Sequence, residues 1–330
     1  MLSRTADHLF WMARYMERAE NVARMLDVNY RMSLLPQSSA DIERQWRAAL
    51  DTMGQLERYE KAGGAFQPLE VMRFMVLDRQ NFSSIYSCLR AARENAHAVR
   101  GTLTSELWET TNATWIAMRS FNQVGLEGDG ASEFFEWVKF RSHLSRGVTV
   151  GTMLRDESLH FIRLGTFLER ADSTARLLDV KFHELSTSDK HDEAAEYYQW
   201  SALLRSVSAF EIFRRVYRDV ITPARVVELL TLRRDMPRSL ACCMEEVYKL
   251  LQQVSNQRSA ETERRAGELA ASLRFGRIDD IFGEGLHEYL TVFIERIADL
   301  GNQISNDFLV PVVEMEQPQS QSQTQTATAS

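Results

Sequence analysis

The feature that most constrains this chain is a segment that occurs twice. Residues 15–28 read YMERAENVARMLDV and residues 167–180 read FLERADSTARLLDV, so Glu, Arg, Ala, Ala, Arg, Leu, Asp and Val return at the same places. The two copies begin 152 positions apart, a separation far larger than any helical periodicity produces. The repeat predicts a duplicated chain whose two halves are organised around these two Glu-Arg segments.

Shorter matches farther along the chain keep nearly the same separation. The members of each pair lie 154 or 155 positions apart: Gln45-Trp46 and Gln199-Trp200, Pro68 and Pro223, Ser84 and Ser239, Cys88 and Cys243, and Gly147 and Gly301. A nearly constant offset predicts that the second half repeats the helix order of the first. We expect repeats at 1–154 and 155–313. A disordered polar tail should follow at 314–330, because its Gln, Ser and Thr residues cannot offset the entropy of ordering.

The composition favours an all-α fold. Only 15 of the 330 residues are glycine and 6 are proline, and apolar residues recur at spacings of three and four through most of the chain. These spacings predict a bundle of two pseudo-symmetric halves, with a loop at 186–192 and a glycine-bearing connection at 275–285. The predicted helices cover residues 3–32, 41–61, 69–77, 82–100, 103–124, 134–144, 157–185, 223–236, 238–253, 261–273 and 286–310.

Charge and motif content argue against several classes of function. A net charge of −7 and a pI of about 5.6 give no basic footprint for nucleic acid or an anionic membrane. The cysteines have no zinc or CxxC spacing, and no uncharged apolar run is long enough to span a bilayer. Walker, dinucleotide and zinc-protease motifs are absent. We expect a cytoplasmic protein without a signal peptide and without a cofactor of its own.

Both Glu-Arg segments carry a stripe of charged residues beside their apolar face. Residues three or four positions apart share one side of a helix, so Glu20 can pair with Arg24, and Arg24 with Asp27. The second copy repeats this pattern. The candidate ligand-binding residues are therefore Glu17, Arg18, Arg24 and Asp27 in the first copy, and Glu169, Arg170, Arg176 and Asp179 in the second.

Three interpretations of these charges are compatible with the sequence. The first is an exposed helix side, whose ion pairs contribute about 0.2–0.5 kcal/mol each. The second is a buried network between the halves, in which loss of one partner costs about 3–5 kcal/mol. The third is one central cavity that offers arginines to an anion and carboxylates to an amine or metal. Arg24 and Arg176 would then be mainly structural, while residues 17–18 and 169–170 face the cavity.

Two other chemistries have less support. Glu-x-x-His spacings, as found in di-iron helical bundles, occur at 94–97, 157–160 and 284–287. They do not return at the repeat offset, so we expect no metal at them. Cys88 and Cys243 share the offset but lie in apolar helical patterns, which indicates core packing rather than nucleophilic catalysis.

Several motifs together resemble one bacterial family. They read ARENA at 92–96, EWVK at 136–139, RSHL at 141–144, RGVT at 146–149, GTMLRDE at 151–157, FIRLG at 161–165 and MPRS at 236–239. With the second Glu-Arg segment they closely resemble the Alpha-E family of helical proteins, over about residues 1–312. The family's Glu-Arg motif corresponds to Glu17-Arg18 and Glu169-Arg170. A further pair, Glu295-Arg296, is out of register with the repeat and is not included.

The resemblance implies an association rather than a settled reaction. Members of the family are encoded beside ATP-grasp amide ligases and transglutaminase-like cysteine peptidases, sometimes with a proteasome-like peptidase. The chain is thus expected to be a helical partner in peptide synthesis, tagging or modification, binding an anionic peptide or amino-acid intermediate at the Glu-Arg helices. The alternatives are an enzyme of that pathway in its own right and a Glu-x-x-His metal-binding bundle.

Overall fold

The computed structural model describes residues 1–36, 38–186 and 193–310. This part of the chain contains fifteen α-helices and no strand, so the predicted all-α fold is confirmed. None of its helices is both long and apolar enough to cross a bilayer. The predicted tail at 314–330 lies outside the described residues, as does most of the predicted loop at 186–192.

The helices follow one another with short connections. The first eight elements are α1 (Ser3–Ser33), α2 (Ser39–Thr52), α3 (Leu56–Lys61), α4 (Pro68–Val76), α5 (Ile85–Ala98), α6 (Ser105–Ser120), the short 3₁₀ helix η1 (Gln123–Leu126) and α7 (Asp129–Thr152). The others are α8 (Glu157–Ser186), α9 (Glu193–Ser206), α10 (Phe210–Tyr217), α11 (Pro223–Thr231), α12 (Leu240–Gln253), α13 (Ala260–Phe275), α14 (Ile278–Glu284), α15 (Leu286–Ile304) and the π-helical turn η2 (Ser305–Leu309).

Helix bounds in the second half follow those in the first. Both ends of α9 lie 154 positions after the ends of α2. Both ends of α11, α12 and α13 lie 155 positions after those of α4, α5 and α6. These bounds support the proposed duplication and the repeats at 1–154 and 155–313, which stay predictions.

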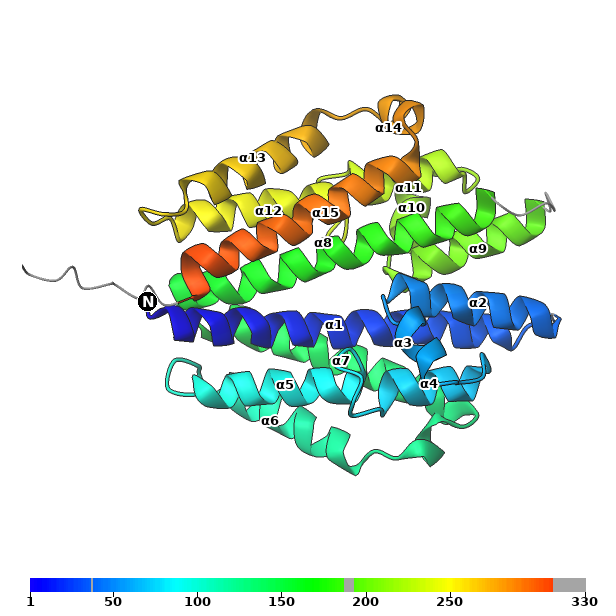
Figure 1. Cartoon of the computed structure of the whole chain (residues 1–330), viewed down its shortest axis with the longest axis horizontal. Coiled ribbons are helices and arrows are strands. Elements are labelled where there is room, and N and C mark those ends of the chain that lie inside the picture. Colours follow the sequence, from blue (N-terminus) through cyan, green and yellow to red (C-terminus); the bar gives the residue numbers. More distant parts are fainter. Residues whose placement is uncertain (37, 187–192, 311–330) are drawn as a thin grey trace, which may run out of the picture.

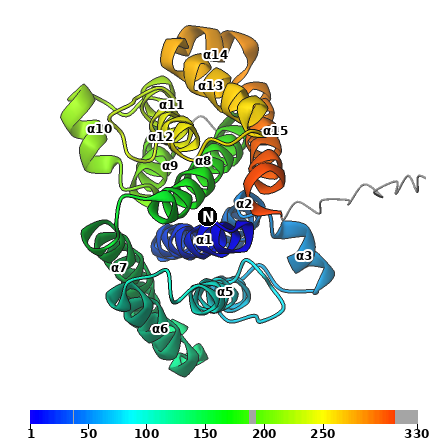
Figure 2. The same cartoon turned by 90° about the vertical axis from the view of Figure 1, so that its left-hand side faces the viewer.

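The first helix of each half lies at the centre of the molecule. Helices α1 and α8 run side by side, with α5 and α7 packed on α1 and with α12 and α15 packed on α8 (Figures 1 and 2). Helix α6 lies outside α5 and α7, and α13 lies outside α12 and α15. In addition, α2 contacts α8 and α9 contacts α1, so each half packs on the central helix of the other. The Glu-Arg segments therefore lie at the contact on which the whole fold is built.

Gly165 lets α8 approach the backbone of α1 very closely. A Cβ atom at this position would lie 2.3 Å from the carbonyl oxygen of Phe10, and a backbone atom cannot rotate aside. We expect Gly165→Ala to lower the free energy of unfolding by about 1–3 kcal/mol, as overpacking usually does. Urea denaturation measures this change.

Gly147→Ala, in the interior of α7, is the matched control. A Cβ atom at Gly147 would meet no atom within 4 Å. Alanine is a better helix former than glycine by about 1 kcal/mol, so this variant should be as stable as the parent or more stable. Equal stability of the Gly165 and Gly147 variants would contradict the close approach of the two central helices.

Three local predictions are wrong. The predicted helix 41–61 is divided into α2 and α3, because Gly54 adopts a left-handed conformation with φ of 63°. The predicted connection at 275–285 instead contains α14, which continues through Gly283. The predicted helix 223–236 is shorter in the structure, because α11 ends at Thr231. Helix α7 includes the predicted pattern at 134–144 and continues through Gly147 and Gly151, because tertiary packing outweighs the cost of about 1 kcal/mol for a glycine inside a helix.

Candidate functional site

The two Glu-Arg segments bind each other across the contact between α1 and α8. Glu17 accepts hydrogen bonds from Nε and Nη2 of Arg170, both at 2.9 Å. Glu169 accepts hydrogen bonds from Nε of Arg18 at 2.6 Å and from its Nη2 at 3.0 Å. Each glutamate is therefore held by the arginine of the other copy, in a bidentate and charge-assisted pair.

Most of the charged stripe on α1 is buried. Glu17 is 1% exposed, Glu20 is not exposed at all, and Glu169 on α8 is 3% exposed. The interpretation as an exposed helix side is therefore wrong for these residues. On α8 the pair of Asp172 and Arg176 is partly open to solvent, with side chains that are 21% and 40% exposed. A buried network between the halves is present, as the second interpretation predicts.

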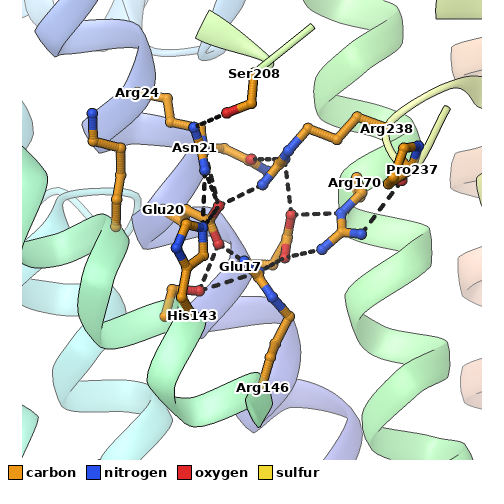
Figure 3. Close-up of polar contacts among 12 residues, drawn as sticks. Glu17, Glu20, Asn21, Arg24, His143, Arg146, Arg170, Ser208, Pro237 and Arg238 are labelled. Atoms are coloured by element: carbon orange, nitrogen blue, oxygen red, sulfur yellow. Dashed lines mark hydrogen bonds and ion pairs between the residues drawn. The ribbon is translucent and has the colours of Figure 1, made fainter. Parts of the chain in front are cut away.

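Residues from four segments join around Glu17 and Glu20 in what we call the Glu17–Glu20 cluster (Figure 3). Its members are Glu17, Glu20 and Arg24 on α1, Arg146 on α7, Arg170 on α8, and Arg238 in the loop before α12. Nη1 of Arg146 binds both carboxylates, at 2.9 Å from Oε2 of Glu17 and 2.5 Å from Oε2 of Glu20. The carboxylates of Glu17 and Glu20 thus hold three segments to α1: helix α7, helix α8 and the loop before α12.

Positive charge exceeds negative charge in this cluster. Four guanidinium groups surround two carboxylates. Burial raises the pKa of Glu17, but Arg170 and Arg238 outweigh it and keep the pKa below its ordinary value. Burial lowers the pKa of Arg238 and outweighs the attraction of Glu17 and Glu20; repulsion from other arginines of the cluster lowers it further. The cluster is therefore a buried, electropositive centre, which favours an anion nearby.

A cavity of about 800 Å³ borders the cluster between α1, α7 and α8. Glu17, Arg146 and Arg170 lie in its wall. Much of the remaining wall is apolar, and it includes Met12, Met16, Leu159, Ile162 and Phe167. Further basic side chains, Arg155, His160 and Arg163, also line it. The cavity therefore combines an apolar wall with an excess of cationic groups.

His160 brings an unsatisfied ring nitrogen to the larger cavity. Its Nδ1 atom is buried and has no hydrogen-bond partner among the described residues. Burial lowers the pKa of His160, and the nearby Arg163 lowers it further. The ring therefore favours the neutral form, in which one nitrogen is free to accept a hydrogen bond.

A second, smaller cavity of about 340 Å³ lies next to the other Glu-Arg pair. Arg18, Glu169 and Arg176 line it, together with Asp172. The charged stripes therefore line two cavities, whereas the third interpretation expected one. Each cavity borders one bidentate pair, since Glu17 and Arg170 line the larger one and Arg18 and Glu169 line the smaller one.

The other candidate residues line neither of these cavities. Arg24 is buried and donates hydrogen bonds to Glu20 and Ser208. Asp27 is held by Arg31 and Lys139, and Asp179 lies 2.6 Å from Nδ1 of His287. All three residues are thus held by other side chains of the protein. Arg176 lines the smaller cavity and pairs with Asp172, and its expected structural role stays a prediction.

Three arginines of the network were not among the predicted site residues. Arg14 donates a hydrogen bond to Glu169 at 2.8 Å, while Arg146 and Arg238 bind Glu17 and Glu20. Arg146 opens the RGVT motif and Arg238 lies in the MPRS motif, so the motifs marked them without indicating a role. Neither has an arginine counterpart at the repeat offset, and for this reason the duplication did not reveal them.

The rival chemistries gain no support from the described residues. None of the groups of His, Cys, Asp and Glu in them is arranged to hold a metal ion. Within the Glu-x-x-His pairs, His97 packs against the ring of Trp108 and His287 binds Asp179. Cys88 and Cys243 are fully buried, and burial raises the pKa of both thiols to about 12. Core packing of the cysteines is confirmed, and the absence of a bound metal stays a prediction.

Comparison with known proteins gives a family but no activity. The chain is 25% identical over 315 residues to the uncharacterized proteins Mb2597 of Mycobacterium bovis and Rv2567 of Mycobacterium tuberculosis. The alignment covers 89% of this chain but 35% of each relative, so the chain spans little more than a third of their length. No solved structure matches it. A family model described as a predicted alpha-helical domain with a conserved ER motif matches residues 1–309, and the chain therefore belongs to the Alpha-E family.

Proposed function

We propose that this protein binds an anionic peptide or amino-acid intermediate in the larger cavity. The observation that carries the proposal is the excess of arginine over carboxylate in the Glu17–Glu20 cluster, two of whose arginines line that cavity. A guanidinium group offers paired N–H donors that match the two oxygens of a carboxylate. An anionic group at this place would offset the uncompensated positive charge.

Two arginines of the cavity have donors to spare. Arg146 makes its contacts with the described residues through Nη1 alone, so its Nε and Nη2 are available to a ligand. Arg155 is exposed in the wall of the cavity, and no hydrogen bond or ion pair holds its side chain among the described residues. A ligand carboxylate bound between such groups would complete their hydrogen bonding without breaking the ion pairs to Glu17.

The lining of the larger cavity indicates which chemical groups the ligand carries besides its carboxylate. Small-molecule sites usually enclose about 300–1,000 Å³ and are mostly apolar with a few polar anchors. The larger cavity has about 800 Å³ and an apolar wall that includes Met16 and Ile162. A short peptide with an apolar side chain and a free carboxylate fits this combination of volume, wall and charge.

The partner proposal comes from the family. An amide ligase joins a carboxylate to an amine, so a protein that holds a carboxylate-bearing peptide suits the role of its accessory. We propose an ATP-grasp amide ligase as the partner, in a cytoplasmic pathway that also uses a transglutaminase-like cysteine peptidase and, in some members, a proteasome-like peptidase. Adding the protein to a purified ATP-grasp amide ligase from the same organism should increase amide product, and no change in product would contradict the partnership.

Ligand binding is tested by calorimetric titration with N-acetyl-leucyl-leucine and with its C-terminal amide. The acid should bind at least ten-fold more tightly than the amide, which corresponds to about 1.4 kcal/mol or more. Arg146→Gln should remove most of this preference. The matched control is Arg264→Gln, because Arg264 pairs only with exposed glutamates of α13. Equal binding of acid and amide by the unaltered protein would refute the proposed anion site.

A further inference from the structure

The loops that precede α5 and α12 have the same local geometry. Oγ of Ser84 donates to the carbonyl oxygen of Asp78, and Oγ of Ser239 donates to that of Arg233. Each serine also caps the helix that follows. A contact between thiol and carbonyl repeats in the same way, from Cys88 to Phe82 and from Cys243 to Pro237. Every pair of counterparts lies 155 positions apart, so Ser83 and Arg238, also 155 apart, hold equivalent places.

Arg238 occupies its place by binding three side chains of α1. Nη1 lies 3.1 Å from Oε1 of Glu17 and 2.9 Å from Oδ1 of Asn21. Nη2 lies 2.5 Å from Oε1 of Glu20. The guanidinium is thus enclosed by two carboxylates and an amide, and Arg238 is 7% exposed.

The corresponding place beside α8 is open. The residues 152 positions after Glu17, Glu20 and Asn21 are Glu169, Asp172 and Ser173. These three line the smaller cavity, and Ser83 lines it with them. A serine side chain is too short to reach them, which leaves about 340 Å³ where the other half has the side chain of an arginine.

We infer that the smaller cavity binds a guanidinium group supplied by a ligand, namely the side chain of arginine, free or within a peptide. This site is separate from the larger cavity and does not depend on what binds there. The inference rests on the internal precedent, since the counterpart residues on α1 already hold a guanidinium in the same protein.

Asp172 is the main acceptor left for such a ligand. It receives hydrogen bonds from the described residues only through Nε of Arg176. Its counterpart Glu20 is bound by Arg24, Arg146 and Arg238, and by Ser142 as well. Asp172 has a side chain that is 21% exposed, so a ligand can reach it from solvent. The carboxylate of Glu169, by contrast, is already paired with Arg14 and Arg18, so it forms part of the cavity wall and is not the main acceptor.

The test uses a probe whose only charge is a guanidinium, N-acetyl-L-arginine amide. Its neutral isostere, N-acetyl-L-citrulline amide, differs by one oxygen in place of a nitrogen. Calorimetry should give one site per chain for the arginine probe and at least ten-fold weaker binding for the citrulline probe. Equal affinity for the two probes would overturn the inference. Tighter binding of N-acetyl-L-aspartate amide would also overturn it, in favour of an anion site at Arg176.

Two variants locate the binding in the smaller cavity. Ser83→Arg supplies the guanidinium from the protein itself, so it should raise the melting temperature and weaken binding of the arginine probe at least ten-fold. Asp172→Asn removes the acceptor and should also weaken binding at least ten-fold. The control is Asp235→Asn, because Asp235 pairs with an arginine on the exposed surface. Unchanged affinity in the Asp172 variant would overturn the inference, even if the Ser83 variant did not fold.

Discussion

Glu17→Gln is expected to lower the free energy of unfolding by about 3–5 kcal/mol, the usual effect of breaking a buried ion pair. The carboxylate of Glu17 binds Arg146, Arg170 and Arg238, and it is 1% exposed. A neutral amide leaves these guanidinium groups with one fewer negative partner in a cluster that already has excess positive charge. Urea denaturation near neutral pH measures the loss.

A double-mutant cycle then shows which arginine Glu17 depends on. Glu17→Gln combined with Arg170→Gln should give a coupling energy within the range of about 0.5–3 kcal/mol that contacting residues show. Arg18→Gln is the matched control, because Arg18 follows Glu17 in sequence but binds Glu169 instead. The coupling of Glu17 with Arg18 should therefore be clearly smaller. Equal coupling in the two cycles would contradict the crossed pairing.

The same variant separates the structural role of Glu17 from the proposed ligand site. Removing a negative charge should weaken the fold but leave the cavity more positive than before. The folded Glu17→Gln protein should therefore bind N-acetyl-leucyl-leucine at least as well as the unaltered protein, whereas Arg146→Gln should bind it less well. Parallel losses of affinity in both variants would mean that the cavity depends on the network for its shape rather than its charge.

The sequence was sufficient to predict that the Glu-Arg helices organise the fold. Helices α1 and α8 are long and carry apolar residues at helical spacing, so their existence follows from local pattern alone. The way their charges pair does not follow from it. Glu17 and Arg18 point about 100° apart on one helix, and only the crossing of α1 over α8 selects Arg170 as the partner.

The rest of the site depends on contacts that no local pattern records. Arg146 is 129 positions from Glu17, and Arg238 is 221 positions away. Neither arginine is repeated at the offset, so the duplication that identified the two Glu-Arg pairs gave no indication of either. The division into two cavities has the same origin, because each cavity borders a pair of side chains from two distant helices. Packing of this kind is decided by the tertiary structure.

Acid should destabilise this protein, and Glu169→Gln should remove part of that effect. Burial raises the pKa of Glu169, but Arg18 and Arg14 outweigh it and lower the pKa from 4.5 to about 2. A carboxyl group with a lowered pKa in the folded state adds stability above its unfolded pKa. This stability is lost as the pH falls through the folded pKa, here between pH 4.5 and about 2. The shift corresponds to about 3 kcal/mol for a fully buried group.

The measurement is the free energy of unfolding at several pH values between 7 and 2. Near neutral pH, Glu169→Gln should be less stable than the parent by about 3–5 kcal/mol, because Arg14 and Arg18 lose their carboxylate. Below pH 4.5 the difference in free energy of unfolding between parent and variant should shrink, because protonation of Glu169 in the parent also removes the ion pairs with Arg14 and Arg18. Glu261→Gln is the control: Arg264 and Arg265 also lower the pKa of Glu261 to about 2, but that carboxylate is exposed. Water and salt screen an exposed pair, so the control should follow the parent at every pH. If both variants reduced the pH dependence of the free energy of unfolding equally, burial between α1 and α8 would not explain the contribution of Glu169 to stability.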